Sequence, residues 1–306
     1  MEAATAGAKR ISKGSAWLRL LRPKQWSKNL LVFAALLFTG NLHDPQGLTL
    51  AGLAFLAMCL ASSGVYIGND VADADRDRAH PRKRGRPIAA GLVSPVAALV
   101  ASSALIVASL CIAETLNRLS LATVVGYLLM QVLYNFWLKR TAVADVFCIA
   151  VGFVLRAVLG AAALGVSISG WLLFCTGSLA LMLGFAKRRQ EFLAQGSEAL
   201  SRESLASYSK EALDSLVLVF SATSILCYGI YCLESPTAKR YPGLVLTALF
   251  VAYGISRYLW LVFAQNEGEE PETLLFKDLH LLASVVLFIF AAAAAVSGWQ
   301  LSVIGG

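Results

Sequence analysis

The chain has 306 residues, 58% of them hydrophobic, and a mean hydropathy of +0.67. This composition excludes an ordinary soluble domain and is typical of a polytopic membrane protein. The net charge is +7, but the charged residues cluster in the loops between apolar runs. We therefore expect no nucleic-acid partner. Residues 1–28 lack the short apolar core of a cleaved signal, so the first apolar run is expected to stay as a membrane helix.

Nine apolar runs follow one another, and they predict an all-α fold with nine transmembrane helices. No soluble domain or low-complexity linker separates them. We therefore expect one transmembrane catalytic domain over residues 1–306, with residues 1–25 as a cytoplasmic N-terminal segment. The runs cover residues 26–41, 48–70, 94–113, 119–137, 142–166, 170–186, 211–233, 242–264 and 276–299.

The loops between these runs differ in charge from one side to the other. The loops on one side carry 21 Lys and Arg residues, and those on the opposite side carry 3. Because cytoplasmic loops carry the excess of Lys and Arg, the basic side is predicted to face the cytoplasm. The predicted location is a bacterial inner membrane, with every candidate chemical group on the cytoplasmic side.

A basic segment, Arg22 to Asn29, lies where the first span begins. Trp and Lys are usual residues of the membrane interface, so one interpretation is an interfacial anchor. The other is a phosphate-binding segment, in which Lys24 and Lys28 are the predicted binding residues.

The second apolar run leads into an acidic segment, Asn69 to Asp77. On a helix of 3.6 residues per turn, Asp70, Asp73 and Asp77 fall within roughly 60° of each other, whereas Asp75 points away. Three carboxylates on one face repel each other unless a cation lies on it. With Asn69 they predict a Mg²⁺ site that shares its ion with substrate phosphates. The alternative is a solvated acidic helix end paired to nearby arginines.

The loop that follows, residues 78–88, is basic and irregular. Pro81 ends the helix, and Gly85 and Pro87 keep the segment from becoming regular. Cations on an irregular loop beside a Mg²⁺ site suit a diphosphate. We predict Lys83 and Arg86 as phosphate-binding residues.

The fourth and fifth spans supply a second group of candidates. Tyr134 ends the fourth span, and the predicted phosphate-binding pair Lys139 and Arg140 follows. Asp145 and Arg156 share one face of the fifth span but are about 16 Å apart along it, so they do not pair with each other. Arg156 lies near the middle of the span, where a charge must face the protein interior or a wet cavity. A structural pair with an acid on another helix is the alternative.

The sixth span ends in a basic segment with one carboxylate. Lys187 and Arg188 are predicted to bind phosphate, and Glu191 lies one turn beyond. Residues 197–210 form a polar amphipathic segment expected on the membrane surface, from which Tyr208 is a weaker site candidate.

Taken without any family, these residues predict an enzyme with a cytoplasm-facing active-site cavity. Mg²⁺ together with many Lys and Arg indicates a diphosphate substrate, and the membrane position indicates a lipid co-substrate. A transporter of a phosphorylated substrate is the rival, since charges within the membrane also mark ion pathways. The concentration of charge on one side, with no relay to the other, favours the enzyme.

The acidic segment and the Arg84-x-Arg86-Pro87 sequence that follows resemble the UbiA-type membrane prenyltransferase superfamily, a nine-helix bundle. Members that prenylate aromatic acceptors carry a second acidic loop after the sixth span. This chain has Lys187-Arg188-Arg189-Gln190-Glu191 there, which is similar to the decaprenyl-phosphate phosphoribosyltransferase branch of the superfamily. The segments 22–29 and 69–81 and the Pro271-Glu272 loop also resemble that branch.

The resemblance implies a Mg²⁺-dependent pentosyltransferase. It would move the 5-phosphoribosyl group from 5-phosphoribosyl 1-diphosphate to a polyprenyl phosphate such as decaprenyl phosphate, release pyrophosphate, and supply a lipid-linked pentose for cell-envelope arabinan. Its partners would be these two substrates and membrane lipid, and the resemblance suggests a homo-oligomer such as a trimer. Prenyl transfer from a prenyl diphosphate to an aromatic or other acceptor remains the alternative within the superfamily.

Overall fold

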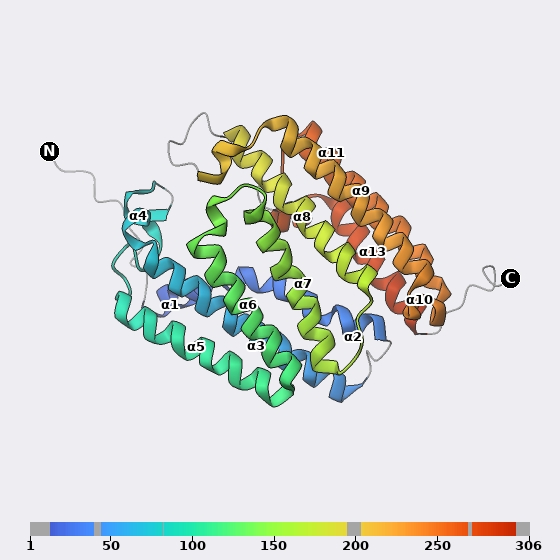
Figure 1. Cartoon of the computed structure of the whole chain (residues 1–306), viewed down its shortest axis with the longest axis horizontal. Helices are drawn as coiled ribbons and strands as arrows, with labels where there is room; N and C mark the ends of the chain where they lie inside the picture. The colour runs from blue at the N-terminus through green and yellow to red at the C-terminus, as the bar shows by residue number, and fades with distance from the viewer. Residues whose placement is uncertain (1–12, 40–43, 82, 195–202, 269–270, 298–306) are drawn as a thin grey trace.

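The computed structural model describes residues 13–39, 44–81, 83–194, 203–268 and 271–297, and these residues form helices joined by short turns (Figure 1). The α-helices are α1 (Lys13–Leu21), α2 (Ala34–Thr39), α3 (Pro45–Ala72), α4 (Ala74–Ala79), α5 (Pro95–Leu116), α6 (Arg118–Phe136), α7 (Ala144–Leu164), α8 (Gly170–Leu193), α9 (Lys210–Glu234), α10 (Pro236–Arg240), α11 (Thr247–Ala264), α12 (Pro271–Lys277) and α13 (Leu279–Val296). The 3₁₀ segments are η1 (Pro23–Phe33), η2 (Lys83–Gly85), η3 (Leu138–Arg140), η5 (Glu203–Ser207) and η6 (Pro242–Leu246).

The predicted all-α membrane architecture is confirmed. Eight helices in the described part of the chain are long and apolar enough to cross a membrane, and they correspond to eight of the nine predicted spans. The first predicted span, residues 26–41, differs. Its described part is divided into the 3₁₀ segment η1 and the short helix α2, so it is not one continuous α-helix.

Local sequence signals set where several helices begin. Asp44, Ser94 and Ser235 each accept a hydrogen bond from a backbone N–H of the first turn, and each is followed by proline. A capping oxygen satisfies an N–H that has no partner inside the helix, and proline at the first helical position lacks that N–H. The start points of α3, α5 and α10 therefore follow from residues next to them in the sequence.

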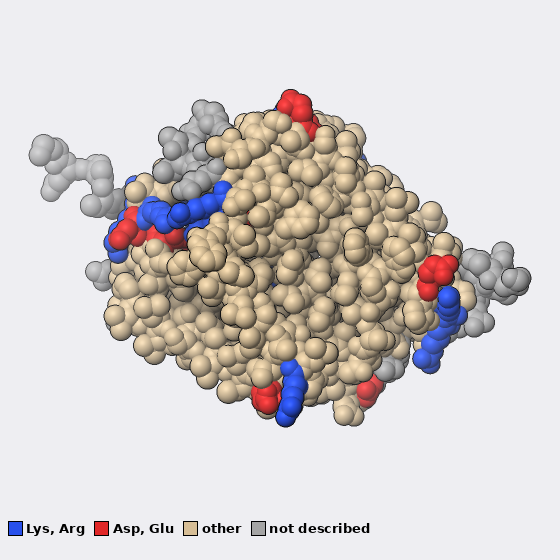
Figure 2. Space-filling model, viewed as in Figure 1, with Lys and Arg blue, Asp and Glu red and all other residues tan. Residues whose placement is uncertain are grey.

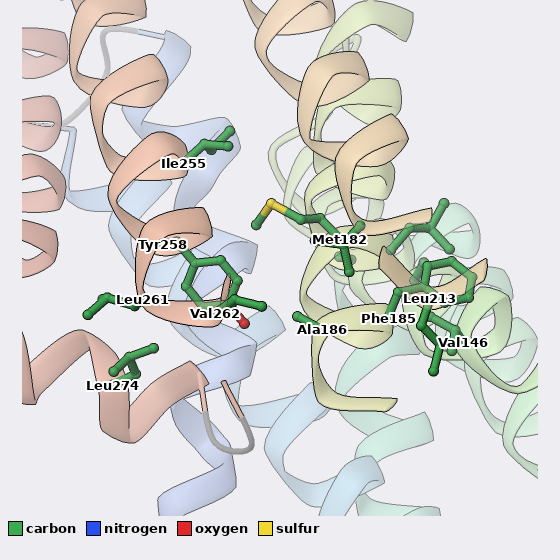
Figure 3. Packing of buried hydrophobic residues seen from close by; sticks show 14 of the residues in the cluster. Val146, Met182, Phe185, Ala186, Leu213, Ile255, Tyr258, Leu261, Val262 and Leu274 are labelled. Carbon is green, nitrogen blue, oxygen red and sulfur yellow. The ribbon is translucent and has the colours of Figure 1, made fainter. Parts of the chain in front are cut away.

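The helices pack through several clusters of buried apolar side chains. The largest joins α7, α8, α9, α11, α12 and α13. Figure 3 shows Met182 and Phe185 of α8 on one side of it and Tyr258 and Val262 of α11 on the other. A second cluster joins α3, α5, α6 and α7. Because both clusters include α7, this helix lies between the two halves of the bundle.

Two glycines allow chain segments to approach closely. A Cβ placed on Gly160 of α7 would lie 1.9 Å from the carbonyl oxygen of Val32 in η1. A Cβ on Gly64 of α3 would lie 2.7 Å from the side chain of Ile106 in α5. Any larger residue at Gly160 would displace η1, the segment that carries the predicted Lys24 and Lys28.

One end of the bundle carries most of the charge, and we call it the charged end. It contains the α3–α4 junction, the α6–α7 junction and the C-terminal end of α8, which lie toward the upper left of Figure 1. Figure 2 shows Lys, Arg, Asp and Glu side chains gathered at that edge, with a broad face of other residues beside it. The predicted site segments are thus brought to the same end.

Candidate active site

Two buried carboxylates and two arginines form a compact group where α3 gives way to α4, and we call it the acidic-helix site. Asp70 and Asp77 are each 3% exposed. The Nη1 atom of Arg86 lies 3.0 Å from Oδ1 of Asp70 and 2.7 Å from Oδ2 of Asp77. Arg22 donates a hydrogen bond to the same Asp70 oxygen. Asp70 and Asp77, which were predicted to lie on one face, thus converge on one cationic nitrogen.

The chain geometry on both sides directs these side chains together. The helical run breaks at Asp73, where φ is −97° and ψ is 4°, and α4 restarts at Ala74. Two residues beyond Arg86, Ile88 is buried against Ile67 and Ala74, which fixes the loop on the helices. Burying one apolar side chain of this size stabilises the arrangement by about 1.5–3 kcal/mol.

Asp73, the third carboxylate of the predicted metal site, has a different partner from Asp70 and Asp77. Asp73 is half-buried and lies 3.7 Å from Nη1 of Arg76, and Asn69 is half-buried at the end of α3. Asp75 is exposed and pairs with Arg78, as its predicted outward direction requires. The expected face of three carboxylates is thus reduced to two that share a partner, because the prediction assumed an unbroken helix.

Arg22 was not among the sequence candidates, although it belongs to the same basic segment. It has positive backbone angles, φ 52° and ψ 57°, and its guanidinium lies 5.0 Å from the centre of the Tyr66 ring. Pro23 follows it, which disfavours a helical conformation at Arg22. Its position before proline is the only local signal that could have marked it.

The predicted lysines lie on short segments at the charged end. Lys24 and Lys83 are exposed, Lys28 and Lys139 are half-buried, and Arg140 is exposed. Within the described residues, the ammonium groups of Lys24, Lys83 and Lys139 form no ion pair. They are solvated cations, which are suited to binding a polyanion without first breaking an internal pair.

Arg156 is buried in α7, and its contacts differ from a structural ion pair. Its Nε donates to Oδ1 of Asn29 at 2.7 Å, and its Nη1 donates to the carbonyl oxygen of Gly152 at 2.7 Å. Its guanidinium lies 5.2 Å from the centre of the Tyr127 ring. No carboxylate of the described residues contacts it. A buried cation held by neutral groups retains an unbalanced positive charge, which favours an anionic ligand.

Asn29, which connects Arg156 to the rest of the site, is fully buried. Its amide donates to Sγ of Cys59 at 3.2 Å and to Oγ of Ser62 at 3.3 Å, both on α3. One side chain thus links η1, α3 and α7. The sequence marked Asn29 only as the last residue of the basic segment.

A second group of charged residues, which we call the α7–α8 cluster, is centred on Asp145. This carboxylate is 0% exposed and accepts hydrogen bonds from Nε of Arg188 at 2.7 Å, from Ser204 at 3.2 Å and from Tyr208 at 3.1 Å. Arg188 also donates to Oε2 of Glu191 at 2.7 Å. Burial raises the pKa of Tyr208 to about 12, so its hydroxyl stays protonated.

The position of Arg188 changes the expectation for the basic segment of α8. Its side chain is 1% exposed and carries two carboxylate partners, whereas phosphate binding requires a guanidinium open to ligand. The next residue, Arg189, is also buried and pairs with Asp214 of α9 at 2.5 Å. Lys187 is half-buried, as is Tyr134 at the end of α6. Arg188 and Arg189 are therefore both held by carboxylates of neighbouring segments.

A cavity of about 460 Å³ lies elsewhere, between α11 and α13. Apolar side chains line most of it, with Tyr253 and His280 among the lining residues. It contains none of the predicted site residues. The predicted cytoplasm-facing cavity is a separate feature and stays a prediction.

A divalent metal ion at the acidic-helix site would require oxygen ligands that lie within reach of one ion. In the described part of the chain no group of three or more His, Cys, Asp or Glu side chains lies close enough to hold a metal. Asp70 and Asp77 nevertheless both contact one nitrogen of Arg86, so one small cation could reach both. Mg²⁺ is usually bound by one or two carboxylates, with waters and substrate phosphates completing its ligands. The residues therefore fit a magnesium ion shared with a phosphorylated substrate.

Fold and site together define a multi-pass helical membrane protein with paired carboxylates and many cations at one end. The chain belongs to the UbiA prenyltransferase family, whose profile matches residues 30–277. It is 33% identical to decaprenyl-phosphate phosphoribosyltransferase of Mycolicibacterium smegmatis, over 92% of each chain. It is 36% identical to the protein of the same name from Mycobacterium tuberculosis, over 92% of this chain and 94% of that one.

A solved structure shows the same fold. The UbiA homolog from Archaeoglobus fulgidus bound to GPP and Mg²⁺ is similar to this chain with a TM-score of 0.70 and 21% identity. The match covers 92% of this chain and 100% of that one. The sequence-based assignment to the superfamily is confirmed.

Proposed function

We propose that the chain transfers the 5-phosphoribosyl group from 5-phosphoribosyl 1-diphosphate to a polyprenyl phosphate, with release of pyrophosphate. The observation that carries the proposal is similarity along nearly the whole chain to proteins named decaprenyl-phosphate phosphoribosyltransferase. The charges of the site support it. Two substrates with three phosphorylated positions between them require many cations, and the place of a second acidic motif is basic here.

The acidic-helix site is the proposed centre for the diphosphate. Asp70 and Asp77 would hold Mg²⁺, with Asn69 and Asp73 beside them. When bound, the ion would neutralise the charge that develops on the departing pyrophosphate. Arg22 and Arg86, which contact the carboxylates in this structure, are partly exposed and able to turn toward the diphosphate oxygens.

The remaining cations divide between the other phosphates. Lys24, Lys28 and Lys83 belong to the segments nearest the acidic-helix site. Lys139 and Arg140 are on η3, which packs against α7 and η5, and Lys187 directly precedes Arg188 of the α7–α8 cluster. We assign the first group to the diphosphate and the second to the 5-phosphate of the donor or the phosphate of the lipid. Arg156 would bind an anionic oxygen deeper in the bundle.

The reaction itself requires little proton transfer from the protein. As the bond from ribose C1 to the diphosphate lengthens, positive charge develops at C1. An oxygen of the lipid phosphate then attacks C1 from the opposite face and forms the new bond. That phosphate is already an anion at pH 7, so no strong general base is needed. The protein would contribute orientation and electrostatic stabilisation.

Asp145, Arg188 and Glu191 have a supporting part in this proposal. Their charges are compensated within the α7–α8 cluster, so they would position neighbouring residues instead of binding phosphate. We place the site on the cytoplasmic side of the bacterial inner membrane, because the predicted basic loops lie on that side. A homo-oligomer such as a trimer, and cell-envelope arabinan as the destination of the product, also remain part of the proposal.

Prenyl transfer is the second candidate. Part of the chain, 40%, is 37% identical to a protoheme IX farnesyltransferase of Desulforudis audaxviator.

The decisive test uses purified protein in detergent with Mg²⁺ and radiolabelled 5-phosphoribosyl 1-diphosphate. We expect label in the lipid and release of pyrophosphate only when polyprenyl phosphate is present. If no labelled lipid forms in this assay, and a prenylated product does form from geranyl diphosphate and an aromatic acid, the result would favour prenyl transfer. Substrate flux across liposomes without pyrophosphate release would favour a transporter.

A further inference from the structure

The backbone is strained where η3 leads into α7. Val143 has φ 67° and ψ −51°, and the N–H of Ala144 donates to the carbonyl oxygen of Ala142 at 2.8 Å. This is a γ-turn with positive φ, which is rare and strained. A β-branched residue in such a conformation is a genuine outlier. Surrounding contacts must hold a turn of this kind in place.

One hydroxyl group supplies those contacts. The N–H of Val143 donates to the hydroxyl oxygen of Tyr208 at 2.5 Å. The same hydroxyl donates to Oδ1 of Asp145 at 3.1 Å, the carboxylate buried in the α7–α8 cluster. Because both the donor and the acceptor role of the hydroxyl are used, the turn is tied to Asp145 through a single side chain. The ring of Tyr208 packs edge-on against Phe185 of α8, with 6.4 Å between ring centres.

The strained turn lies next to two of the cations proposed to bind phosphate. Lys139 and Arg140 end η3, four and three residues before Val143. The N–H of Asp145 donates to the carbonyl oxygen of Thr141 at 3.1 Å, so the intervening backbone is continuous with the start of α7. A change at Val143 would therefore move the backbone that carries both cations.

We propose that Tyr208 is a positioning residue that holds the Val143 turn and thereby orients Lys139 and Arg140 toward the 5-phosphate of the donor, which is one of the two phosphates assigned to them above. The proposal rests on the proposed function for the identity of the donor. Residues 203–209, which precede α9, are thus more than a connection between two spans. They supply the side chain that sets the geometry of the α6–α7 junction. Lost orientation weakens binding of the phosphorylated ligand and leaves the acidic-helix site intact.

The variant Tyr208→Phe tests this, because it removes the hydroxyl and keeps the ring against Phe185. Hydrogen–deuterium exchange of residues 137–147 should become at least about tenfold faster, since the Val143 N–H loses its acceptor. The KM for 5-phosphoribosyl 1-diphosphate should rise about tenfold, with kcat within about twofold, as expected when binding contacts are weakened.

A matched control and a rescue separate positioning from a general loss of stability. Tyr228→Phe removes another buried hydroxyl contact, the 2.7 Å bond to Thr247, in a different core cluster. It should leave both the exchange of residues 137–147 and KM unchanged. Val143→Gly added to Tyr208→Phe should restore KM to within about threefold of the wild type, because glycine adopts positive φ without strain. If Tyr208→Phe does not fold, this double variant compared with Val143→Gly alone answers the same question.

The other outcomes of these experiments distinguish a failure of the role proposed for Tyr208 from a failure of the proposed function. Wild-type exchange in Tyr208→Phe would overturn the role of the hydroxyl, and faster exchange with an unchanged KM would overturn the orientation of the cations. A KM for the double variant far above that of Val143→Gly alone would also overturn it. If the wild type releases no pyrophosphate from the donor, the proposed function fails, and the exchange data still decide whether Tyr208 holds the turn.

Discussion

The acidic-helix site and the α7–α8 cluster are both built from arginine–carboxylate pairs, yet they differ in access to solvent. In the first, the carboxylates are buried but the side chains of Arg22 and Arg86 remain 27% and 30% exposed. In the second, Arg188 is 1% exposed and its partner Asp145 is 0% exposed. The same kind of ion pair therefore occurs once with partly exposed arginines and once fully buried in the interior.

This difference predicts different roles. A partly exposed arginine can leave its carboxylate and be hydrated, so Arg22 and Arg86 can exchange one anionic partner for another. A fully buried pair cannot separate without leaving an uncompensated charge in an apolar surrounding. We infer that the acidic-helix site is arranged for ligand exchange and that the α7–α8 cluster is arranged for fixed geometry.

The largest effect is expected at the acidic-helix site. Asp70→Asn and Asp77→Asn should each lower kcat/KM for phosphoribosyl transfer by about 10³-fold or more, because the stabilisation of the leaving pyrophosphate is lost. Their thermal unfolding temperatures should change little, since the released arginines reach water. Asp75→Asn is the control, because Asp75 is exposed and pairs with Arg78, outside the acidic-helix site. A loss of activity as large in Asp75→Asn would refute the two-carboxylate site.

The next effect concerns folding and is expected at the α7–α8 cluster. Asp145→Asn removes one of the two carboxylate partners of the buried Arg188 and should destabilise the protein by at most about 3–5 kcal/mol, because Glu191 still pairs with it. Thermal unfolding in detergent measures this, with Glu234→Gln as control, because Glu234 is exposed and lies 3.8 Å from Lys239. Adding Arg188→Met to Asp145→Asn should recover part of the loss. If Asp145→Asn is as stable as the control and only activity falls, the contrast between the two sites is wrong.

A smaller effect sharpens the exchange role of Arg86. Arg86→Gln should raise the KM for the donor by about tenfold to a hundredfold, since a charge-assisted phosphate contact is lost. It should also lower the Mg²⁺ concentration that gives half-maximal activity, because Arg86 contacts the same two carboxylate oxygens. Titration of Mg²⁺ at saturating donor measures this. An unchanged KM with a higher Mg²⁺ requirement would show that Arg86 only supports the carboxylates.

The smallest effect is expected for Arg257 and Asp278, a pair outside both sites. The hydrogen bond from Arg257 lowers the pKa of Asp278 below its usual value of 3.8. The pair therefore contributes stability above about pH 4 and loses it as the pH falls through the lowered pKa. Asp278→Asn should lower the unfolding temperature by no more than about 2 °C at pH 7, and this difference should vanish in acid. A difference that persists below pH 3 would assign it to the helix cap that Asp278 forms on α13.

The sequence predicted the parts of the protein that depend on neighbouring residues. Runs of apolar residues identified eight continuous spans, because crossing a bilayer as a helix is a local requirement. The spacing of Asp70 and Asp77 predicted that they would share one face, and both do contact Arg86. The division of the first span into η1 and α2 was not predicted, because hydropathy does not distinguish a 3₁₀ segment from an α-helix.

Contacts between distant segments were decided only by the tertiary structure. Lys187, Arg188 and Arg189 are equivalent as a string of cations, and the rotation of α8 against α7 and α9 directs Arg188 to Asp145 and Arg189 to Asp214. The bond from Arg156 to Asn29 joins residues 127 positions apart, and the bond from Val143 to Tyr208 joins residues 65 apart. Hydropathy and helical period act over a few residues. The partner of a buried charge is instead set by which helices pack together. The sequence by itself therefore determined where the charges lie along the chain. The packing of the bundle determined which of them are buried in ion pairs and which are accessible to a substrate.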